Sequence, residues 1–148
     1  GRRGDEMRIY EINEQVLGLA RSEFSYLADS AARIVPVLGD GRLMLEREPD
    51  QGFDLLAMDA FSGDSIPAHL LTLEAMQTYL RHLRPDGILA VHITNRYLDL
   101  QPVMAAAAQH FGKTALLYEL ERDDDNDLCF TTDWVLIAGV LQQPGPLG

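Results

Sequence analysis

Apolar runs rich in β-branched residues alternate along this chain with stretches of helical spacing, and this alternation limits the fold more than any other feature. The order of the predicted elements is β-α-β-α-β-α-β-α-β-β. Such an order favours an α/β fold, with a mainly parallel sheet covered on both faces by helices. Only a loop joins the last two strands, so we expect them to pair antiparallel at one edge. The predicted strands are Met7–Ile12, Arg33–Leu38, Phe53–Asp59, Gly87–Thr94, Thr114–Leu120 and Asp133–Val140.

Four segments between the strands have the apolar spacing of helices. They are Glu14–Phe24, Arg42–Arg47, the stretch with Leu73, Met76, Leu80 and Leu83, and Leu100–Phe111 with Val103, Met104, Ala107 and Phe111 on one stripe. Asn13 and Thr72 are placed to cap the first and third helices, and Pro85-Asp86-Gly87 is expected to end the third. No internal repeat or domain boundary is visible. Residues 1–141 are therefore predicted to form one domain, and residues 142–148 a flexible tail.

The charge balance limits the classes of ligand that suit this chain. Its 148 residues include 12 Lys and Arg against 23 Asp and Glu, a formal net charge of −11. Nucleic acid and anionic lipid bind clustered Lys and Arg, so both are disfavoured and direct membrane contact is not expected, whereas cationic ligands are favoured. Cys129 is the only cysteine. It excludes an internal disulfide framework and favours a reducing, cytoplasmic compartment.

Three acidic side chains follow three successive predicted strands. Glu11 lies at the end of the first, Asp40 follows the second within Gly39-Asp40-Gly41, and Asp59 ends the third. Ligands of an open parallel sheet bind outside the carboxyl ends of its strands, so we expect the three acids at one rim. Glu11 would suit the two hydroxyls of a ribose, Asp40 an adenine amine and Asp59 a substrate amine. For each acid taken alone, capping of the next helix or turn is an equal alternative.

The longest loop before a helix, Asp59–His69, also holds Ser62 and Asp64, and such loops commonly carry functional groups. Trp134 is interpreted as core or edge packing. No metal site is predicted, because the histidines are scattered over different elements: His69, His82, His92 and His110.

Five short motifs occur in order with a spacing that is typical of one family. They are Tyr10–Asn13, Gly39–Arg42, Phe53–Asp59, Pro67–Thr72 and Leu83–Gly87. Over roughly residues 7 to 111 the chain resembles the spermidine synthase (polyamine aminopropyltransferase) family, within the class I S-adenosylmethionine-dependent methyltransferase fold. It is similar to the spermidine-synthase-like domains of bacteria, including those fused to membrane segments. The resemblance implies a Rossmann-like, mostly parallel sheet with an antiparallel edge strand.

The resemblance also implies an activity and a site. The activity is transfer of an aminopropyl group to a polyamine amine, with S-adenosylmethionine or its decarboxylated form as the nucleoside substrate and no metal. Glu11, Gly39, Asp40, Gly41 and Asp59 would surround the nucleoside, with Glu11 on the ribose and Asp40 on the adenine. Asp59 would also begin the catalytic loop, which orients the attacking amine. The second acid of that loop falls on Ser62, and Asp64 is the candidate substitute.

Two departures from the family leave other functions open. Ser62 motivates a non-catalytic or ligand-sensing domain, and a methyltransferase acting on another small acceptor is a third reading, because a fold does not fix a substrate. No G-x-G-x-G follows any strand. The family's first strand and glycine-rich loop are thus expected to be missing by N-terminal truncation, which would leave this chain inactive alone. The exposed sheet edge is expected to pair with a second copy in a homodimer.

Overall fold

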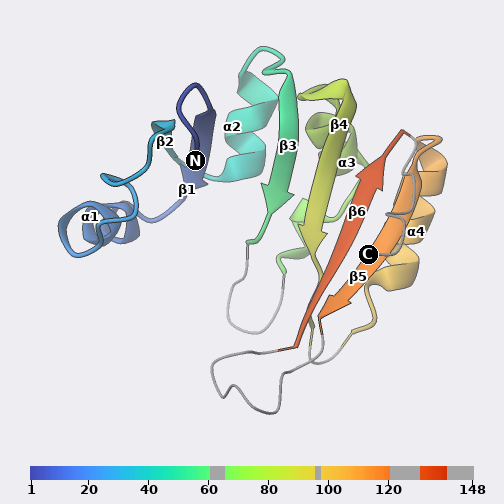
Figure 1. Cartoon of the computed structure of the whole chain (residues 1–148). Coiled ribbons are helices and arrows are strands. Elements are labelled where there is room, and N and C mark those ends of the chain that lie inside the picture. Colours follow the sequence, from blue (N-terminus) through green and yellow to red (C-terminus); the bar gives the residue numbers. More distant parts are fainter. Residues whose placement is uncertain (61–65, 96–97, 121–130, 140–148) are drawn as a thin grey trace, which may run out of the picture. The chain divides into compact units, whose positions relative to one another are not determined.

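The computed structural model describes residues 1–60, 66–95, 98–120 and 131–139. The chain divides into two compact units, Gly1–Glu48 and Pro49–Gly148, and each is described here by itself (Figure 1). The prediction of a single domain over residues 1–141 stays a prediction. The predicted tail, residues 142–148, lies outside the described residues.

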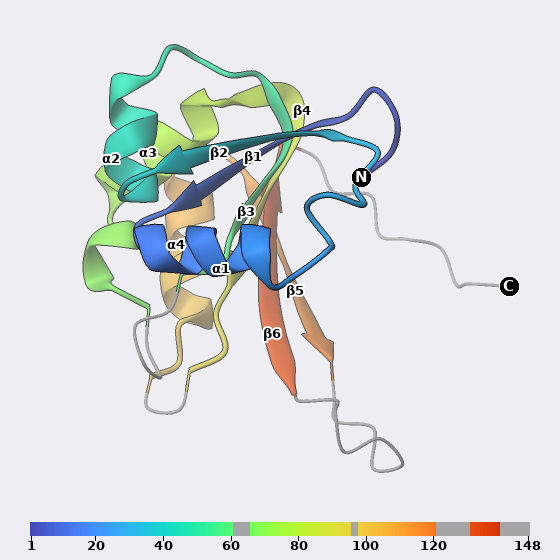
Figure 2. The same cartoon turned by 90° about the vertical axis from the view of Figure 1, so that its left-hand side faces the viewer.

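The first unit contains two parallel strands and two helices. In chain order these are β1 (Glu6–Glu11), α1 (Glu14–Ser22), β2 (Arg33–Leu38) and α2 (Gly41–Arg47). The register of the strands runs from Glu6 opposite Arg33 to Glu11 opposite Leu38, and Figure 2 shows the two strands side by side. The predicted boundaries of both strands were within one residue of those observed.

Side-chain caps and one ion-pair cluster fix the local structure of the first unit. Asn13 Oδ1 accepts the Gln15 N–H at 2.9 Å and so begins α1, as predicted. Arg8 and Tyr10 of β1 both contact the carboxylate of Glu48 at the end of α2, through Arg8 Nη2–Oε1 at 2.6 Å and Tyr10 OH–Oε2 at 2.8 Å. Burial raises the pKa of the Tyr10 hydroxyl, and its hydrogen bond to Glu48 acts in the same direction.

The second unit is a four-stranded mixed sheet with two α-helices. Its order in space is β3-β4-β6-β5: β3 and β4 are parallel, and β6 is antiparallel to both β4 and β5. The predicted antiparallel pairing of the last two strands is confirmed, with β5 at the edge of this sheet. In chain order the elements are β3 (Phe53–Met58), a 3₁₀ turn (Ala68–Leu70), α3 (Leu73–Arg81), β4 (Leu83–His92), α4 (Gln101–His110), β5 (Thr114–Leu120) and β6 (Thr132–Ala138).

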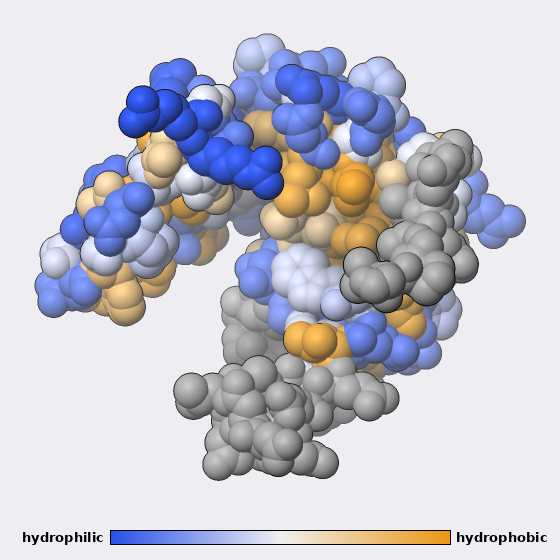
Figure 3. Space-filling model, in the orientation of Figure 1, coloured by the Kyte–Doolittle hydropathy of each residue, from blue (hydrophilic) through white to orange (hydrophobic). Residues whose placement is uncertain are grey.

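The core of the second unit lies between its sheet and its helices. Figures 1 and 2 both place α3 and α4 on the same face of the sheet. Figure 3 shows the other face, on which hydrophobic side chains lie over the strands. Among the described helices, none is long and apolar enough to span a membrane. The largest fully buried side chains are Met76 of α3, Met104 of α4, Leu89 and Val91 of β4, Ile137 of β6, and His82.

The predictions for the end of the third helix and the start of the next strand were wrong: Leu83, assigned to the helix, is the first residue of β4, which was expected to begin at Gly87. Pro85-Asp86-Gly87 does not end the third helix: α3 ends at Arg81, and those three residues already belong to β4. They form a bulge, because Phe53 is opposite Leu83 while Leu55 is opposite Ile88. A bulge is one of the few places in a sheet that tolerate proline, which cannot donate to the strand ladder.

Candidate functional site

The first unit brings two of the predicted acids together. Glu11 is the last residue of β1, and Asp40 lies two residues after the end of β2. The Gly39 N–H donates to the Glu11 carbonyl oxygen at 2.9 Å, which joins the two turns at the carboxyl ends of the parallel strands. The structure therefore places the predicted nucleoside-binding residues of this unit at one edge.

Both acids of this edge also make the local contacts that were the alternative interpretation. The Asp40 Oδ1 accepts the Leu43 N–H at 3.0 Å and begins α2. The Glu11 Oε1 accepts the Asn13 N–H at 2.7 Å. Gly39, with a φ of +142°, occupies a backbone conformation that favours glycine. These contacts fix the orientation of both carboxylates. Helix capping and ligand binding both require a fixed orientation, so the contacts agree with either interpretation.

The third acid, Asp59, belongs to the second unit and directly follows β3. Its Oδ1 lies 2.7 Å from the Nδ1 of His92, the last residue of β4. The Asp59 side chain is 58% exposed, whereas that of His92 is 19% exposed. We call these two residues the Asp59–His92 pair. It presents a partly exposed carboxylate, held from behind by an imidazole, at the carboxyl ends of two parallel strands.

Thr94 and strand β6 hold the other side of the imidazole. The His92 Nε2 lies 2.7 Å from the Thr94 Oγ1 and 2.9 Å from the Thr132 Oγ1. The indole of Trp134, which is opposite His92 in the antiparallel register, stacks on the imidazole with ring centroids 4.7 Å apart and an interplanar angle of 9°. The position of the His92 ring is thereby fixed on its Nε2 edge and on one face.

Sequence reasoning missed this part of the site. It set His92 aside among scattered histidines and interpreted Trp134 as packing. The spacing of His92 and Thr94 was an available signal, since residues two apart at the exit of a strand share one face. The approach of Thr132 and Trp134 was not available, because it depends on the register between β4 and β6.

Two further residues of the predicted site remain. Ser62 and Asp64 lie outside the described residues. In the described part of the chain, no group of three or more His, Cys, Asp or Glu side chains could hold a metal ion.

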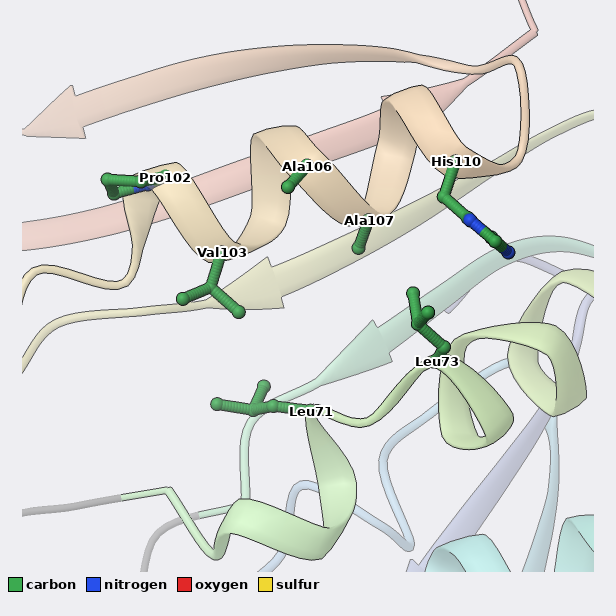
Figure 4. A pocket seen from close by; sticks show the side chains of 7 residues that line it. All are labelled: Leu71, Leu73, Pro102, Val103, Ala106, Ala107 and His110. Atoms are coloured by element: carbon green, nitrogen blue, oxygen red, sulfur yellow. The ribbon is translucent and has the colours of Figure 1, made fainter.

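A hollow of about 600 Å³ lies elsewhere in the second unit, between α4 and the start of α3. Figure 4 shows side chains from the two helical segments around it. Apart from His110, the lining side chains are apolar, and no predicted site residue is among them. The hollow contains none of the carboxylates on which the predicted chemistry depends, and the candidate site lies instead at the strand ends. The hollow is lined by Leu71, Leu73, Pro102, Val103, Ala106, Ala107 and His110.

Comparison with known proteins identifies the fold. No protein-family model matches the chain. It is 31% identical over 88 residues to the polyamine aminopropyltransferase of Vibrio vulnificus (strain CMCP6), and the match covers 58% of this chain and 29% of that protein. The chain therefore spans less than a third of this curated relative.

Two solved structures with low sequence identity share the fold. A spermidine synthase in complex with the transition state analogue AdoDATO matches with a TM-score of 0.68 and 16% identity, over 93% of this chain and 48% of that one. Human methyltransferase-like protein 13 in complex with SAH also matches with a TM-score of 0.68 and 16% identity, over 92% of this chain and 61% of that one. The chain thus has a spermidine synthase-like fold of the class I S-adenosylmethionine-dependent methyltransferase type.

Proposed function

We propose that this chain is a spermidine synthase-like transferase domain, which binds an S-adenosylmethionine-type nucleoside and transfers an aminopropyl group to the amine of a polyamine. The observation that carries the proposal is the Asp59–His92 pair, with its partly exposed carboxylate at the end of β3. Ligands of such sheets bind outside the carboxyl ends of the strands. The similarity to a polyamine aminopropyltransferase and to a spermidine synthase with AdoDATO supports the same chemistry.

The reaction needs alignment and a proton acceptor. The lone pair of the amine nitrogen forms a bond to the aminopropyl carbon attached to the sulfonium. The carbon–sulfur bond breaks, and its electron pair stays on sulfur, which leaves in the neutral thioether methylthioadenosine. Because a protonated amine has no lone pair, the nitrogen gives up one proton before it attacks. Asp59 is the group we assign to orient the cationic amine and accept that proton, because a carboxylate suits both tasks.

The acids of the first unit are assigned to the nucleoside. Glu11 would accept hydrogen bonds from the ribose hydroxyls, and Asp40 from the adenine amine. The contacts that hold Glu11 and Asp40 in place support this assignment, since a fixed acceptor loses less conformational entropy when a ligand binds.

The direct test is product formation by the full natural protein. The protein is incubated with putrescine and either decarboxylated S-adenosylmethionine or S-adenosylmethionine, and the products are identified by mass spectrometry. We expect spermidine and methylthioadenosine from the decarboxylated nucleoside. D59N should lower kcat/KM by about 10²- to 10⁴-fold, the usual contribution of a general base.

A matched control comes from the same strand. D54N makes the same change at an exposed carboxylate of β3 that pairs with Arg84, and it should leave kcat/KM nearly unchanged. Methylthioadenosine at about 100 times its Kd should also stabilise the protein by roughly 2.7 kcal/mol. Absence of both spermidine formation and this stabilisation would contradict the proposal.

Two observations favour other functions, and the same assay separates them. The protein with SAH matches as well as the spermidine synthase does, with a TM-score of 0.68 for each. Methyl transfer from S-adenosylmethionine to an added amine would identify a methyltransferase. Ser62 stands where the family has its second loop acid. If only S62D forms spermidine, the natural domain is a non-catalytic form that binds its ligand without turnover.

A further inference from the structure

We infer that His92 is a positioning residue, which fixes the orientation of the Asp59 carboxylate toward the attacking amine. The inference deepens the proposed function and rests on it for the identity of the amine. Its structural part, the protonation of a stated nitrogen of His92, can be tested without any turnover.

The hydrogen bonds around the two threonines indicate which imidazole nitrogen carries the proton. The Thr132 Oγ1 accepts the indole N–H of Trp134 at 3.1 Å, and the Thr94 Oγ1 accepts the backbone N–H of Asp133 at 2.8 Å. Each hydroxyl oxygen thus already accepts one hydrogen bond, and its own proton can point to the His92 Nε2. An ionised carboxylate only accepts hydrogen bonds, so the proton of a neutral His92 lies on Nδ1, which faces the Asp59 Oδ1, and Nε2 accepts from a threonine hydroxyl.

This arrangement turns a mobile surface carboxylate into an oriented one. The imidazole, stacked on Trp134 and contacted by two hydroxyls, is a rigid donor behind Asp59. It engages the Oδ1 atom at 2.7 Å. Within the described residues, the other carboxylate oxygen of Asp59, whose side chain is 58% exposed, remains available to a ligand. A single fixed hydrogen bond therefore decides where the proton-accepting oxygen points.

Orientation of this kind bears directly on the proposed chemistry. Attack by an amine on a sulfonium-bound carbon depends on alignment, and misplacement by about 1 Å can cost roughly 10²-fold in rate. A histidine that only packed the end of β4 would have no such effect. It would contribute through its ring, and the position of its N–H would not matter.

The first arm of the test is NMR spectroscopy of the ¹⁵N-labelled natural protein. Long-range ¹H–¹⁵N correlations assign the protonated nitrogen of each neutral imidazole. We expect Nδ1 to be protonated in His92, and we expect D59A to shift its tautomer equilibrium toward Nε2. Protonation at Nε2 in the wild-type protein would overturn the inference, whether or not the protein is active.

The second arm compares two amide variants that differ only in reach. The side-chain nitrogen of Asn lies near the position of Nδ1, and that of Gln near Nε2. H92N therefore keeps a donor toward Asp59 and should retain most of the wild-type kcat/KM for the amine. H92Q lacks that donor and should lose about 10- to 100-fold, the range expected for a hydrogen bond to a charged group. The KM for the nucleoside should stay unchanged in both variants.

The outcomes separate this inference from the proposed function. Equal losses in H92N and H92Q, with both variants folded by circular dichroism, would overturn the positioning role. In a third outcome, the wild-type protein forms no spermidine, but its His92 is protonated at Nδ1 and D59A shifts that tautomer. This outcome would contradict the proposed function and support the oriented Asp59–His92 pair.

Discussion

Replacement of Gly87 by alanine tests whether the bulge at the start of β4 is packed as described. A Cβ atom at this position would lie 2.8 Å from the Phe53 carbonyl oxygen and 3.1 Å from both the N and the O of Arg84. All three neighbours are backbone atoms, which cannot rotate away as a side chain can. The β3 and β4 backbones would have to separate by several tenths of an ångström along a ladder that leads to the Asp59–His92 pair.

We expect G87A to destabilise the protein by about 3 kcal/mol, the upper end of the cost of overpacking, because backbone atoms surround the added methyl group. For a unit of this size each kcal/mol lowers Tm by about 4–8 °C. Urea and thermal denaturation followed by circular dichroism measure the change. G18A is the matched control: a Cβ there meets nothing within 4 Å, in the middle of α1. It should stabilise that helix by about 0.5–1 kcal/mol. A G87A protein within about 0.5 kcal/mol of wild type would refute the reasoning.

Three further changes test other parts of the structure. The folded state raises the Tyr10 pKa and so holds the proton longer than the unfolded state. Stability should therefore fall as pH rises above about 10, and Y10F should remove this slope from the pH dependence of the urea midpoint. The Thr72 Oγ1 caps α3 by accepting the Ala75 N–H at 3.2 Å, so T72A should cost about 1 kcal/mol in urea denaturation. M76A, at a side chain only 1% exposed, should cost about 2–5 kcal/mol by the same measurement, while M7A, at 44% exposure, should cost far less.

Much of the secondary structure could be predicted from spacing alone, but the apolar stripes were only partly right. Met76 and Met104 are buried as their stripes require. Leu73 and Val103, assigned to the same stripes, are each 44% exposed, because they line the hollow between α4 and the start of α3. Periodicity defines a helix face, but it does not determine how closely two neighbouring helices approach. That distance depends on packing between segments distant in sequence.

The candidate site shows the same difference between what local spacing predicts and what packing between distant segments determines. The positions of Glu11, Asp40 and Asp59 were predictable, because a residue at or just after the end of a strand lies at the edge of the sheet in any arrangement of the strands. Two of the partners of His92, Thr132 and Trp134, come from β6, and residues 121–130, which precede this strand in the chain, lie outside the described structure. Loop length and composition do not set the register between β4 and β6. The sequence therefore predicted the position of Asp59 and offered only the spacing of His92 and Thr94 as a signal for His92, whose contacts with Thr132 and Trp134 depend on the register of β4 and β6.

The fold alone does not choose between aminopropyl and methyl transfer, since the structures with AdoDATO and with SAH match with the same TM-score of 0.68. The choice depends on side chains at the strand ends. A neutral acceptor has no charge for a carboxylate to bind, whereas a cationic amine needs a carboxylate both to bind and to lose its proton, whichever group is transferred. A carboxylate tied through one oxygen to a rigid imidazole, in a chain with a net charge of −11, fits the second requirement. The relative activities of D59N with a polyamine and with a neutral acceptor therefore identify the class of acceptor, and the products formed from decarboxylated S-adenosylmethionine and from S-adenosylmethionine distinguish the two reactions.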